Sequence, residues 1–172
     1  CFYRFFYDSW LFCSRVVFFM IDVYKFDSRA KVPTRANYTD AGLDLYSNES
    51  VFVELGSTVT ISTGVAVHIP KGSVGKIEDR SSLAAKGLRT GGGVIDAGYN
   101  GEVKVVLHNF SANTDQIYGA GYEQKGTWIS IDDAIAQLLI YKIESVIAME
   151  TKILWDSNRG SKGFGSSDGK KA

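Results

Sequence analysis

The sequence predicts an all-β domain with one short helix, arranged as a compact β-sandwich or jelly roll. Glycine accounts for 18 of the 172 residues, above the roughly 7 per cent that is usual, while proline occurs only twice. Short segments of alternating polar and apolar residues follow one another, and turn-forming residues separate them. Many short strands joined by glycine turns are typical of sandwiches and barrels.

Two segments carry the alternation most clearly. Residues 58–69 alternate around Gly64, which predicts a half-buried strand with a bend or bulge at the glycine. Residues 101–109 place every second side chain from Val103 to Leu107 on one apolar face. Both segments are therefore expected to lie over the core.

Three further segments complete the expected elements. Residues 134–143 are almost continuously apolar, which fits a strand or a helix, and the lack of helix caps favours a strand. Residues 81–88 predict one or two helical turns with serine caps and an exit near Gly87. Residues 111–126 are polar and turn-rich, so we expect a long hairpin loop.

The composition divides the chain into three parts. Residues 1–19 are rich in aromatic residues and lack glycine, so we interpret them as upstream sequence preceding a start at Met20, with a membrane or partner anchor as the alternative. Residues 20–155 form the β domain. Residues 156–172 are rich in Gly, Ser and Lys, which is typical of a flexible arm.

The charge balance and the cysteines exclude several classes of function. Lysines plus arginines number 19 and acidic residues 19, so no net charge favours nucleic acid or an anionic membrane, although an anionic small ligand remains possible. Cys1 and Cys13 lie outside the domain and indicate neither a disulfide framework nor a thiolate metal site. Without a secretion or transmembrane signal, we expect a cytoplasmic or nuclear protein.

Two clusters of polar residues are suited to phosphate or metal chemistry. Asp44 lies between two leucines, and alternation directs its side chain away from their apolar face; a solvated strand acid is the alternative. Arg80, Ser81 and Ser82 open the expected helix, where hydroxyls, N–H groups, the helix dipole and a guanidinium favour an anion. The alternative is an ordinary helix cap with a surface arginine.

The ribbon TGGGVIDAGYNG, residues 90–101, carries a single carboxylate, Asp96, and a single tyrosine, Tyr99. A hairpin almost without side chains lets a ligand touch the main chain directly, so peptide groups can pair with the edge of a flat heterocycle. Asp96 is then placed to take a proton from water, and Tyr99 to lie against a sugar. An Asx turn is the alternative reading of Asp96.

Two weaker clusters follow towards the C-terminus. Gln137 is one amide in an apolar run, and a structural hydrogen bond is its ordinary role. Residues 159–169 read RGSKGFGSSDG, a glycine-rich segment able to fold over a phosphate chain while Phe164 stacks on a base. A disordered tail is the alternative.

Taken in order, these clusters resemble the five motifs of the trimeric dUTPase family, from about Val23 to Gly169. The matching stretches are AGLDL, RSSLAAKG, GGGVIDAGYNG, IAQL and RGSKGFGSS. The resemblance implies a distorted jelly-roll protomer and a homotrimer with active sites shared between subunits. It also implies Mg²⁺-dependent hydrolysis of dUTP to dUMP and pyrophosphate, which limits uracil incorporation into DNA and supplies dUMP for dTMP synthesis.

The resemblance assigns roles in the base and sugar region. Asp96 matches the carboxylate that activates the water attacking the α-phosphorus. Tyr99 underlies the deoxyribose and rejects a 2′-hydroxyl. The main chain at Gly93, Val94 and Ile95 reads the edge of uracil and excludes the methyl group of thymine.

The resemblance also assigns the phosphate and metal contacts. Arg80, Ser81, Ser82 and Gln137 hold the phosphates, and Asp44 holds a water in the Mg²⁺ shell. The mobile arm closes over a site on another subunit and contributes Arg159, Phe164, Gly165, Ser166 and Ser167.

Three features depart from the family pattern. The fourth motif usually begins Gly-Asp, whereas here it begins Asp132-Asp133. Asp168 follows the paired serines where the family commonly has Gly, and the segment 111–126 is longer than expected. These departures affect turn chemistry and affinity, and none removes a catalytic residue.

Three rival functions fit parts of the sequence. A dCTP deaminase resembles this chain in fold, but it needs a general-base Glu where this chain has Val106. A nucleotide-responsive binding protein would keep the pocket without catalysis; the intact Asp96 and the complete arm argue against it, whereas the changes at Asp132 and Asp168 leave it open. A jelly-roll structural or lectin-like module leaves five phosphate-suited clusters unexplained.

Overall fold

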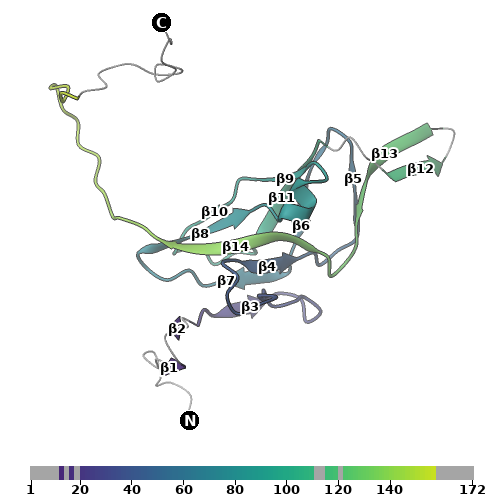
Figure 1. The fold of residues 1–172 in the computed structure, drawn as a ribbon, viewed down its shortest axis with the longest axis horizontal. Helices are drawn as coiled ribbons and strands as arrows, with labels where there is room; N and C mark the ends of the chain where they lie inside the picture. The colour runs from purple at the N-terminus through teal and green to yellow at the C-terminus, as the bar shows by residue number, and fades with distance from the viewer. Residues whose placement is uncertain (1–11, 14–15, 18–19, 111–114, 120–121, 158–172) are drawn as a thin grey trace, which may run out of the picture.

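The computed structural model describes residues 12–13, 16–17, 20–110, 115–119 and 122–157, with side chains for residues 20–110 and 125–157. A β-rich body carries a projecting hairpin and a long extended segment after its last strand (Figure 1). In the described residues the only helix is the four-residue α1 (Ser81–Ala84). The predicted all-β class with one short helix is therefore confirmed.

The first sheet has four antiparallel strands in the order β10-β8-β14-β4. Its strands are β10 (Val94–Ile95), β8 (Ser73–Glu78), β14 (Ala134–Lys142) and β4 (Leu43–Tyr46). Residues 134–143 thus form the predicted strand. On β14, Gln137 lies opposite Glu78 on one side and Asp44 on the other, so the register brings the predicted site residues together.

The second sheet has the order β6-β11-β9, and a separate pair joins β3 to β7. These strands are β6 (Thr58–Ser62), β11 (Lys104–Asn109), β9 (Leu88–Gly91), β3 (Val23–Lys25) and β7 (Val65–Val67). Gly64 separates β6 from β7 with φ +69°, in the left-handed region that favours glycine. The bend predicted at Gly64 is confirmed.

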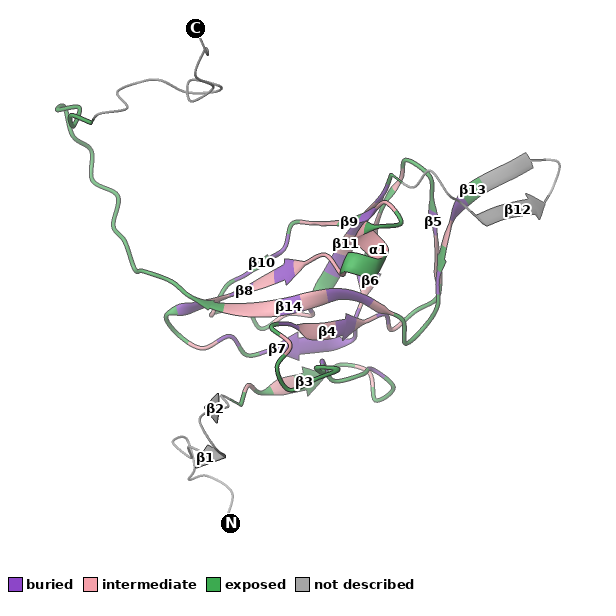
Figure 2. Ribbon diagram, in the orientation of Figure 1, coloured by how far each residue is buried: buried purple, intermediate pink, exposed green. Residues whose placement is uncertain are grey.

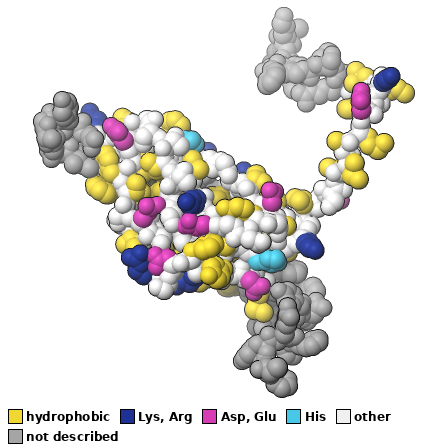
Figure 3. All heavy atoms as spheres, turned by 180° about the vertical axis from the view of Figure 1, so that it is seen from behind, with side chains coloured by type: hydrophobic (Ala, Val, Ile, Leu, Met, Phe, Trp, Pro, Cys, Tyr) yellow, Lys and Arg dark blue, Asp and Glu magenta, His cyan; other side chains and the backbone are white. Residues whose placement is uncertain are grey.

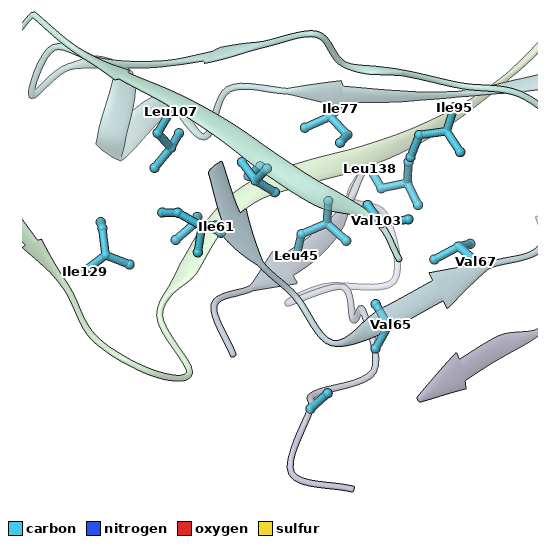
Figure 4. Packing of buried hydrophobic residues seen from close by; sticks show 14 of the residues in the cluster. Leu45, Ile61, Val65, Val67, Ile77, Ile95, Val103, Leu107, Ile129 and Leu138 are labelled. Carbon is cyan, nitrogen blue, oxygen red and sulfur yellow. The ribbon is translucent and has the colours of Figure 1, made fainter. Parts of the chain in front are cut away.

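The hydrophobic core lies between the first sheet and the strands β6, β7 and β11 (Figure 4). Leu45 and Leu138 approach from the first sheet and meet Ile61 and Val65. The face predicted from Val103 to Leu107 is buried, since all three of its alternate residues are at most 2 per cent exposed. Removing such apolar surface from water contributes about 25 cal/mol per Å² and drives the packing of the strands.

The third sheet corrects the prediction for residues 111–126. Its order is β12-β13-β5, with β5 (Val51–Glu54), β12 (Asp115–Gly119) and β13 (Tyr122–Ile129). The expected long loop is wrong, because β12 and β13 pair as an antiparallel hairpin that projects from the body (Figure 1). The polar composition of these residues did not indicate strands. β13 nevertheless extends into the body, where it pairs with β5. A further pair, β1 (Phe12–Cys13) with β2 (Val16–Val17), precedes the body.

Beyond β14 the chain leaves the body, and residues 143–157 are all exposed (Figure 2). We call residues 143–157 the tail. Hydrophobic side chains occur along it (Figure 3), at Ile143, Val146, Ile147, Met149, Ile153, Leu154 and Trp155. The predicted division at residues 19 and 155 stays a prediction. No helix in the described part of the chain has the length and apolar character needed to cross a membrane.

The backbone conformation at Asp132 explains why aspartate can replace the glycine that usually begins the fourth family motif. It lies in the turn between β13 and β14 with φ +71°, and among the described non-glycine residues it is the only one with positive φ. Its N–H donates to the Ser47 carbonyl at 2.8 Å, so a residue outside the turn holds the turn in this conformation. Aspartate tolerates the left-handed region better than most residues, which accounts for its presence where the family usually has glycine.

Substitution of Asp132 tests this conformational constraint. Asp132→Gly is expected to leave the free energy of unfolding within about 0.5 kcal/mol, because glycine adopts positive φ without strain. Asp132→Val is expected to lower it by about 1–2 kcal/mol, because a β-branched side chain is strained there. Urea denaturation at neutral pH measures both values, and equal stability of the two variants would contradict the account.

Candidate active site

The phosphate-suited cluster begins where β8 ends. Arg80 is the N-cap residue of α1, with extended backbone and without a side-chain cap, and Ser81 and Ser82 are the first two helical residues. The predicted serine caps are therefore wrong: the two serines lie one and two residues after the N-cap, and both are exposed. A helix of four residues sums few peptide dipoles, so the hydroxyls and the guanidinium are the groups available to an anion.

Arg80 is held by two other strands of the first sheet. Its Nε donates to Asp44 Oδ1 at 2.9 Å and its Nη2 to Asp44 Oδ2 at 3.4 Å, while Nη1 donates to the Ala134 carbonyl at 3.0 Å. Both side chains of the ion pair are partly buried. A two-point guanidinium–carboxylate pair fixes the plane of the arginine, so its remaining N–H groups have a defined direction.

These residues line a polar hollow of about 200 Å³. Its lining residues are Ala36, Asp40, Gly42, Asp44, Arg80, Ser81, Ser82 and Gln137. All five residues that the sequence assigned to phosphate and metal contacts lie here together. We call this space the phosphate hollow.

Gln137 lies in the phosphate hollow and also makes a structural bond. Its Nε2 donates to the Asp79 carbonyl at 2.8 Å. Gly42 makes room for the amide, because a Cβ at that position would lie 2.5 Å from Gln137 Oε1. Gly42, in the stretch AGLDL, is therefore needed so that Gln137, in the stretch IAQL, can enter the phosphate hollow.

Asp79 is a residue that the sequence analysis missed. Its Oδ1 accepts hydrogen bonds from the N–H and hydroxyl of Thr90, at 2.6 and 2.9 Å, and its Oδ2 pairs with Arg89 Nε at 2.6 Å. Burial raises the pKa of Asp79, but these hydrogen bonds and the Arg89 charge outweigh it, so the pKa lies below its ordinary value. Asp79 thereby joins the start of α1 to β9, which leads into the glycine ribbon.

The glycine ribbon is held against β8. The Ile77 N–H donates to the Gly93 carbonyl at 2.7 Å, and a Cβ on Gly93 would lie 2.5 Å from the Ile77 oxygen. Gly92 turns the chain with φ +61°. The main chain at Val94 and Ile95 then forms β10 at the edge of the first sheet, with the Val94 side chain exposed and Ile95 buried.

Asp96 and Tyr99 follow in a tight turn. The Tyr99 N–H donates to the Asp96 carbonyl at 3.0 Å, so the turn is closed by main chain and the expected alternative of an Asx turn is not needed. The Asp96 residue is exposed. The Tyr99 hydroxyl donates to the Glu102 carbonyl at 2.9 Å, and the ring lies so close to Gly101 that a Cβ there would be 2.5 Å from the hydroxyl.

Residues of this turn line a second hollow of about 220 Å³. Its lining residues are Ile77, Gly92, Val94, Ile95, Asp96, Tyr99, Glu102, Val103 and Lys104. We call it the base hollow. The two hollows share no lining residue, so the described part of one chain presents the predicted site in two separate halves.

The arm residues Arg159, Phe164, Gly165, Ser166 and Ser167 lie outside the described residues, as does Asp168. In the residues that are described, no three His, Cys, Asp or Glu side chains gather as a metal cage. Asp44 and Asp40 are partly buried acids of the phosphate hollow, and so few carboxylates fit a hydrated cation held mainly by phosphate oxygens.

A protein-family model described as dUTPase matches residues 28–168. The chain belongs to the dUTPase family. It is 41 per cent identical over 152 residues to deoxyuridine 5'-triphosphate nucleotidohydrolase of Nocardia farcinica, covering 87 per cent of this chain and 86 per cent of the relative. The same enzyme of Candida albicans is 38 per cent identical over 149 residues, covering 85 and 86 per cent. The expectation of an enzyme of this family is confirmed.

Solved structures of dUTPases share the fold. The dUTPase of Staphylococcus bacteriophage 80alpha, bound to dUpNHpp, superposes with a TM-score of 0.75 at 33 per cent identity and covers 86 per cent of this chain and 98 per cent of the phage chain. A variant of the phage phi11 dUTPase, which coordinates a structural Mg(II) ion, gives a TM-score of 0.67 at 28 per cent identity, covering 80 and 99 per cent. These dUTPase neighbours agree with the predicted jelly-roll-like architecture.

The lowered pKa of Asp79 gives a testable pH dependence. A carboxyl with a lower pKa in the folded state contributes stability above its unfolded pKa, about 3.9, and loses it as the pH falls through the folded value. Asp79→Asn is expected to lower the free energy of unfolding by about 1 kcal/mol at pH 7. Below about pH 4 the free energies of unfolding of the variant and the parent chain are expected to converge. Urea denaturation from pH 7 to pH 3 measures this, with Glu78→Gln as an exposed control. A constant difference across that range would contradict the account.

Proposed function

We propose that this dUTPase-family protein hydrolyses dUTP to dUMP and pyrophosphate, which limits uracil incorporation into DNA and supplies dUMP for dTMP synthesis. The observation that carries the proposal is the separation of one base hollow, with an exposed carboxylate, from one phosphate hollow, with a guanidinium and two hydroxyls. Each hollow suits one end of a nucleoside triphosphate. The phage 80alpha dUTPase was solved with dUpNHpp, which supports the same substrate class here.

The edge strand β10 selects the base. In the first sheet β10 pairs only with β8, so its other edge has peptide N–H and C=O groups directed outward. Such groups match the donor and acceptor edge of uracil, and the crowded main chain at Gly93 excludes the methyl group of thymine. Tyr99 lies beneath the deoxyribose and excludes a 2′-hydroxyl.

The phosphate hollow binds the triphosphate through Arg80, Ser81, Ser82 and Gln137. The Asp44 carboxylate fixes the arginine plane and also lies where it can hold a water of the Mg²⁺ shell. A Mg²⁺ ion held there would supply positive charge that stabilises the pyrophosphate leaving group. The phi11 relative coordinates a structural Mg(II) ion, which supports the cation requirement.

Asp96 activates the nucleophile. Its carboxylate orients a water and accepts its proton while the water oxygen bonds to the α-phosphorus. The bond from the α-phosphorus to the bridging oxygen breaks, and pyrophosphate leaves with that oxygen. Arginine and hydroxyl groups that are already in place meet the developing charge, so little reorganisation is needed during the reaction.

A homotrimer would unite the two halves of the site. Since the two hollows of one chain are separate, a base hollow from one protomer facing a phosphate hollow from another gives a complete site. The apolar tail, exposed along its length, supports packing against another copy. The arm residues Arg159, Phe164 and Gly165 to Ser167 would close over a site on another subunit. The balanced charge gives no basis for direct contact with nucleic acid or membrane.

The assigned base is tested by Asp96→Asn. Turnover of dUTP with Mg²⁺ is expected to fall by about 10²–10⁴-fold, because the amide cannot accept the water proton. Affinity for a non-hydrolysable imido analogue of dUTP should stay within about threefold. Pyrophosphate release and calorimetric titration measure the two quantities, and dTTP, dCTP and UTP serve as comparison substrates. Retained turnover would remove Asp96 from this role, and a parent chain that binds without turnover would identify a binding protein.

The shared site is tested by mixing two inactive variants. Asp96→Asn lacks the base and Arg80→Gln lacks the phosphate arginine, so each homotrimer should be inactive. Unfolded together and refolded at equal amounts, they should regain about a quarter of the parent activity, since that fraction of interfaces joins two intact halves. Mixing either variant with the Asp96→Asn, Arg80→Gln double variant should restore none. Failure of the first mixture, with mixed trimers shown by mass spectrometry, would place both halves on one chain.

A further inference from the structure

Glu102 is a mostly buried acid of the base hollow to which no role has yet been given. Its Oε1 accepts hydrogen bonds from the Ser62 hydroxyl and from the Gly64 N–H, the latter at 2.8 Å. Its Oε2 lies 3.7 Å from Lys104 Nζ, and the side chain is 22 per cent exposed. The carboxylate therefore reaches across to the bend between β6 and β7, far from Glu102 in sequence.

The next residue extends the same attachment. The Val103 N–H donates to the Val65 carbonyl at 2.8 Å, and the buried Thr63 hydroxyl donates to the Val103 carbonyl. Residues 102–103 are thus tied along the whole bend at residues 62–65. We call this set of contacts the clasp.

The bend is closely packed, and this packing supports the clasp. Gly64 has φ +69°, and a Cβ on it would lie 2.7 Å from the Ala30 Cβ. Glycine is therefore the residue that fits this conformation and this space, and the close packing limits movement of the backbone there. A group anchored to this bend has little freedom to move.

The clasp bears on Tyr99 through the Glu102 carbonyl. That carbonyl accepts a hydrogen bond from the Tyr99 hydroxyl at 2.9 Å, and Tyr99 is 47 per cent exposed. An exposed ring is orientated by its two ends: its backbone, fixed by the turn at Asp96, and its hydroxyl, fixed by Glu102. Movement of Glu102 would let the ring tilt.

We propose that Glu102 is a positioning residue that fixes the plane of Tyr99 and thereby sets the discrimination between deoxyribonucleotides and ribonucleotides. The inference rests on the proposed function, because it takes Tyr99 as the residue beneath the sugar. A steric filter rejects one additional hydroxyl only if the filtering group cannot move aside. Glu102 supplies that resistance without touching the substrate.

The charge state of Glu102 suits an anchor. Burial raises its pKa, but the hydrogen bonds from Ser62 and Gly64 and the charge of Lys104 outweigh it, so the pKa lies below its ordinary value. The group is therefore ionised at neutral pH, and hydrogen bonds to a carboxylate are stronger than those to a neutral acceptor. Glutamine at this position would keep the Oε1 acceptor with weaker hydrogen bonds and would lose the interaction with Lys104.

The test compares Glu102→Ala, Glu102→Gln and Ser62→Ala with Glu49→Ala as the matched control. Glu49 also holds the end of β6, through a hydrogen bond from the Ser62 N–H at 2.8 Å, but within the described residues its side chain makes no hydrogen bond to residues 99–103. We expect Glu102→Ala to lower the ratio of kcat/KM for dUTP to that for UTP by about tenfold. Glu102→Gln should restore most of the ratio, Ser62→Ala should lower it about threefold, and Glu49→Ala should leave it unchanged.

A second measurement separates this inference from the proposed function. Amide hydrogen exchange needs no substrate, and it should accelerate at Gly64, Tyr99 and Val103, whose N–H groups are hydrogen-bonded, in Glu102→Ala but not in Glu49→Ala. If the parent chain fails to hydrolyse dUTP, the proposed function falls while exchange still tests the clasp. Unchanged exchange, or an unchanged dUTP to UTP ratio in a folded and active Glu102→Ala or Ser62→Ala, would overturn the role of Glu102.

A double-mutant cycle locates the effect on the tyrosine. Tyr99→Phe removes the hydroxyl that Glu102 holds, so Glu102→Ala added to it should lower the dUTP to UTP ratio by less than twofold further. Additive losses would mean that Glu102 acts by another route and would contradict the inference.

Discussion

The close approach of Gly93 to Ile77 is the contact on which both halves of the site depend. The Ile77 N–H bonds the Gly93 carbonyl at 2.7 Å, and no side chain fits between the two main chains. This contact fixes the glycine ribbon along β8, and β8 ends at Glu78, two residues before Arg80. One strand therefore carries the base hollow along its length and the phosphate hollow at its end.

Local charge, and not net charge, defines the phosphate hollow. The chain has equal numbers of basic and acidic residues, yet Asp44 holds Arg80 in one plane while Asp79 ties the same turn to β9. Two partly buried carboxylates, one on β4 and one just after β8, thus orient Arg80 and the start of α1. An anionic ligand needs such placed donors, whereas a long-range field would favour polyanions.

The proposed trimer would account for two features of the described chain. Its two hollows have no residue in common, and its tail exposes side chains from Ile143 to Trp155 that water solvates poorly. The clasp at Glu102 differs in this respect, because all its contacts lie within one protomer. In the proposed trimer, sugar selection would therefore be prepared within one protomer, whereas phosphate binding to the same nucleotide would need a second protomer.

Local patterns were enough to predict the strands over the core and the bend at Gly64, because alternation and glycine placement are local properties of the chain. The motif residues of both hollows followed from the resemblance to the dUTPase family. Sequence patterns misplaced the serines of α1 and missed the strands within residues 111–126, since caps and strand pairing depend on partners elsewhere. The roles of Asp79 and Glu102 could be assigned only from the folded structure. The carboxylate of Glu102 bonds groups 38 and 40 residues away, and no local pattern encodes a contact over that separation.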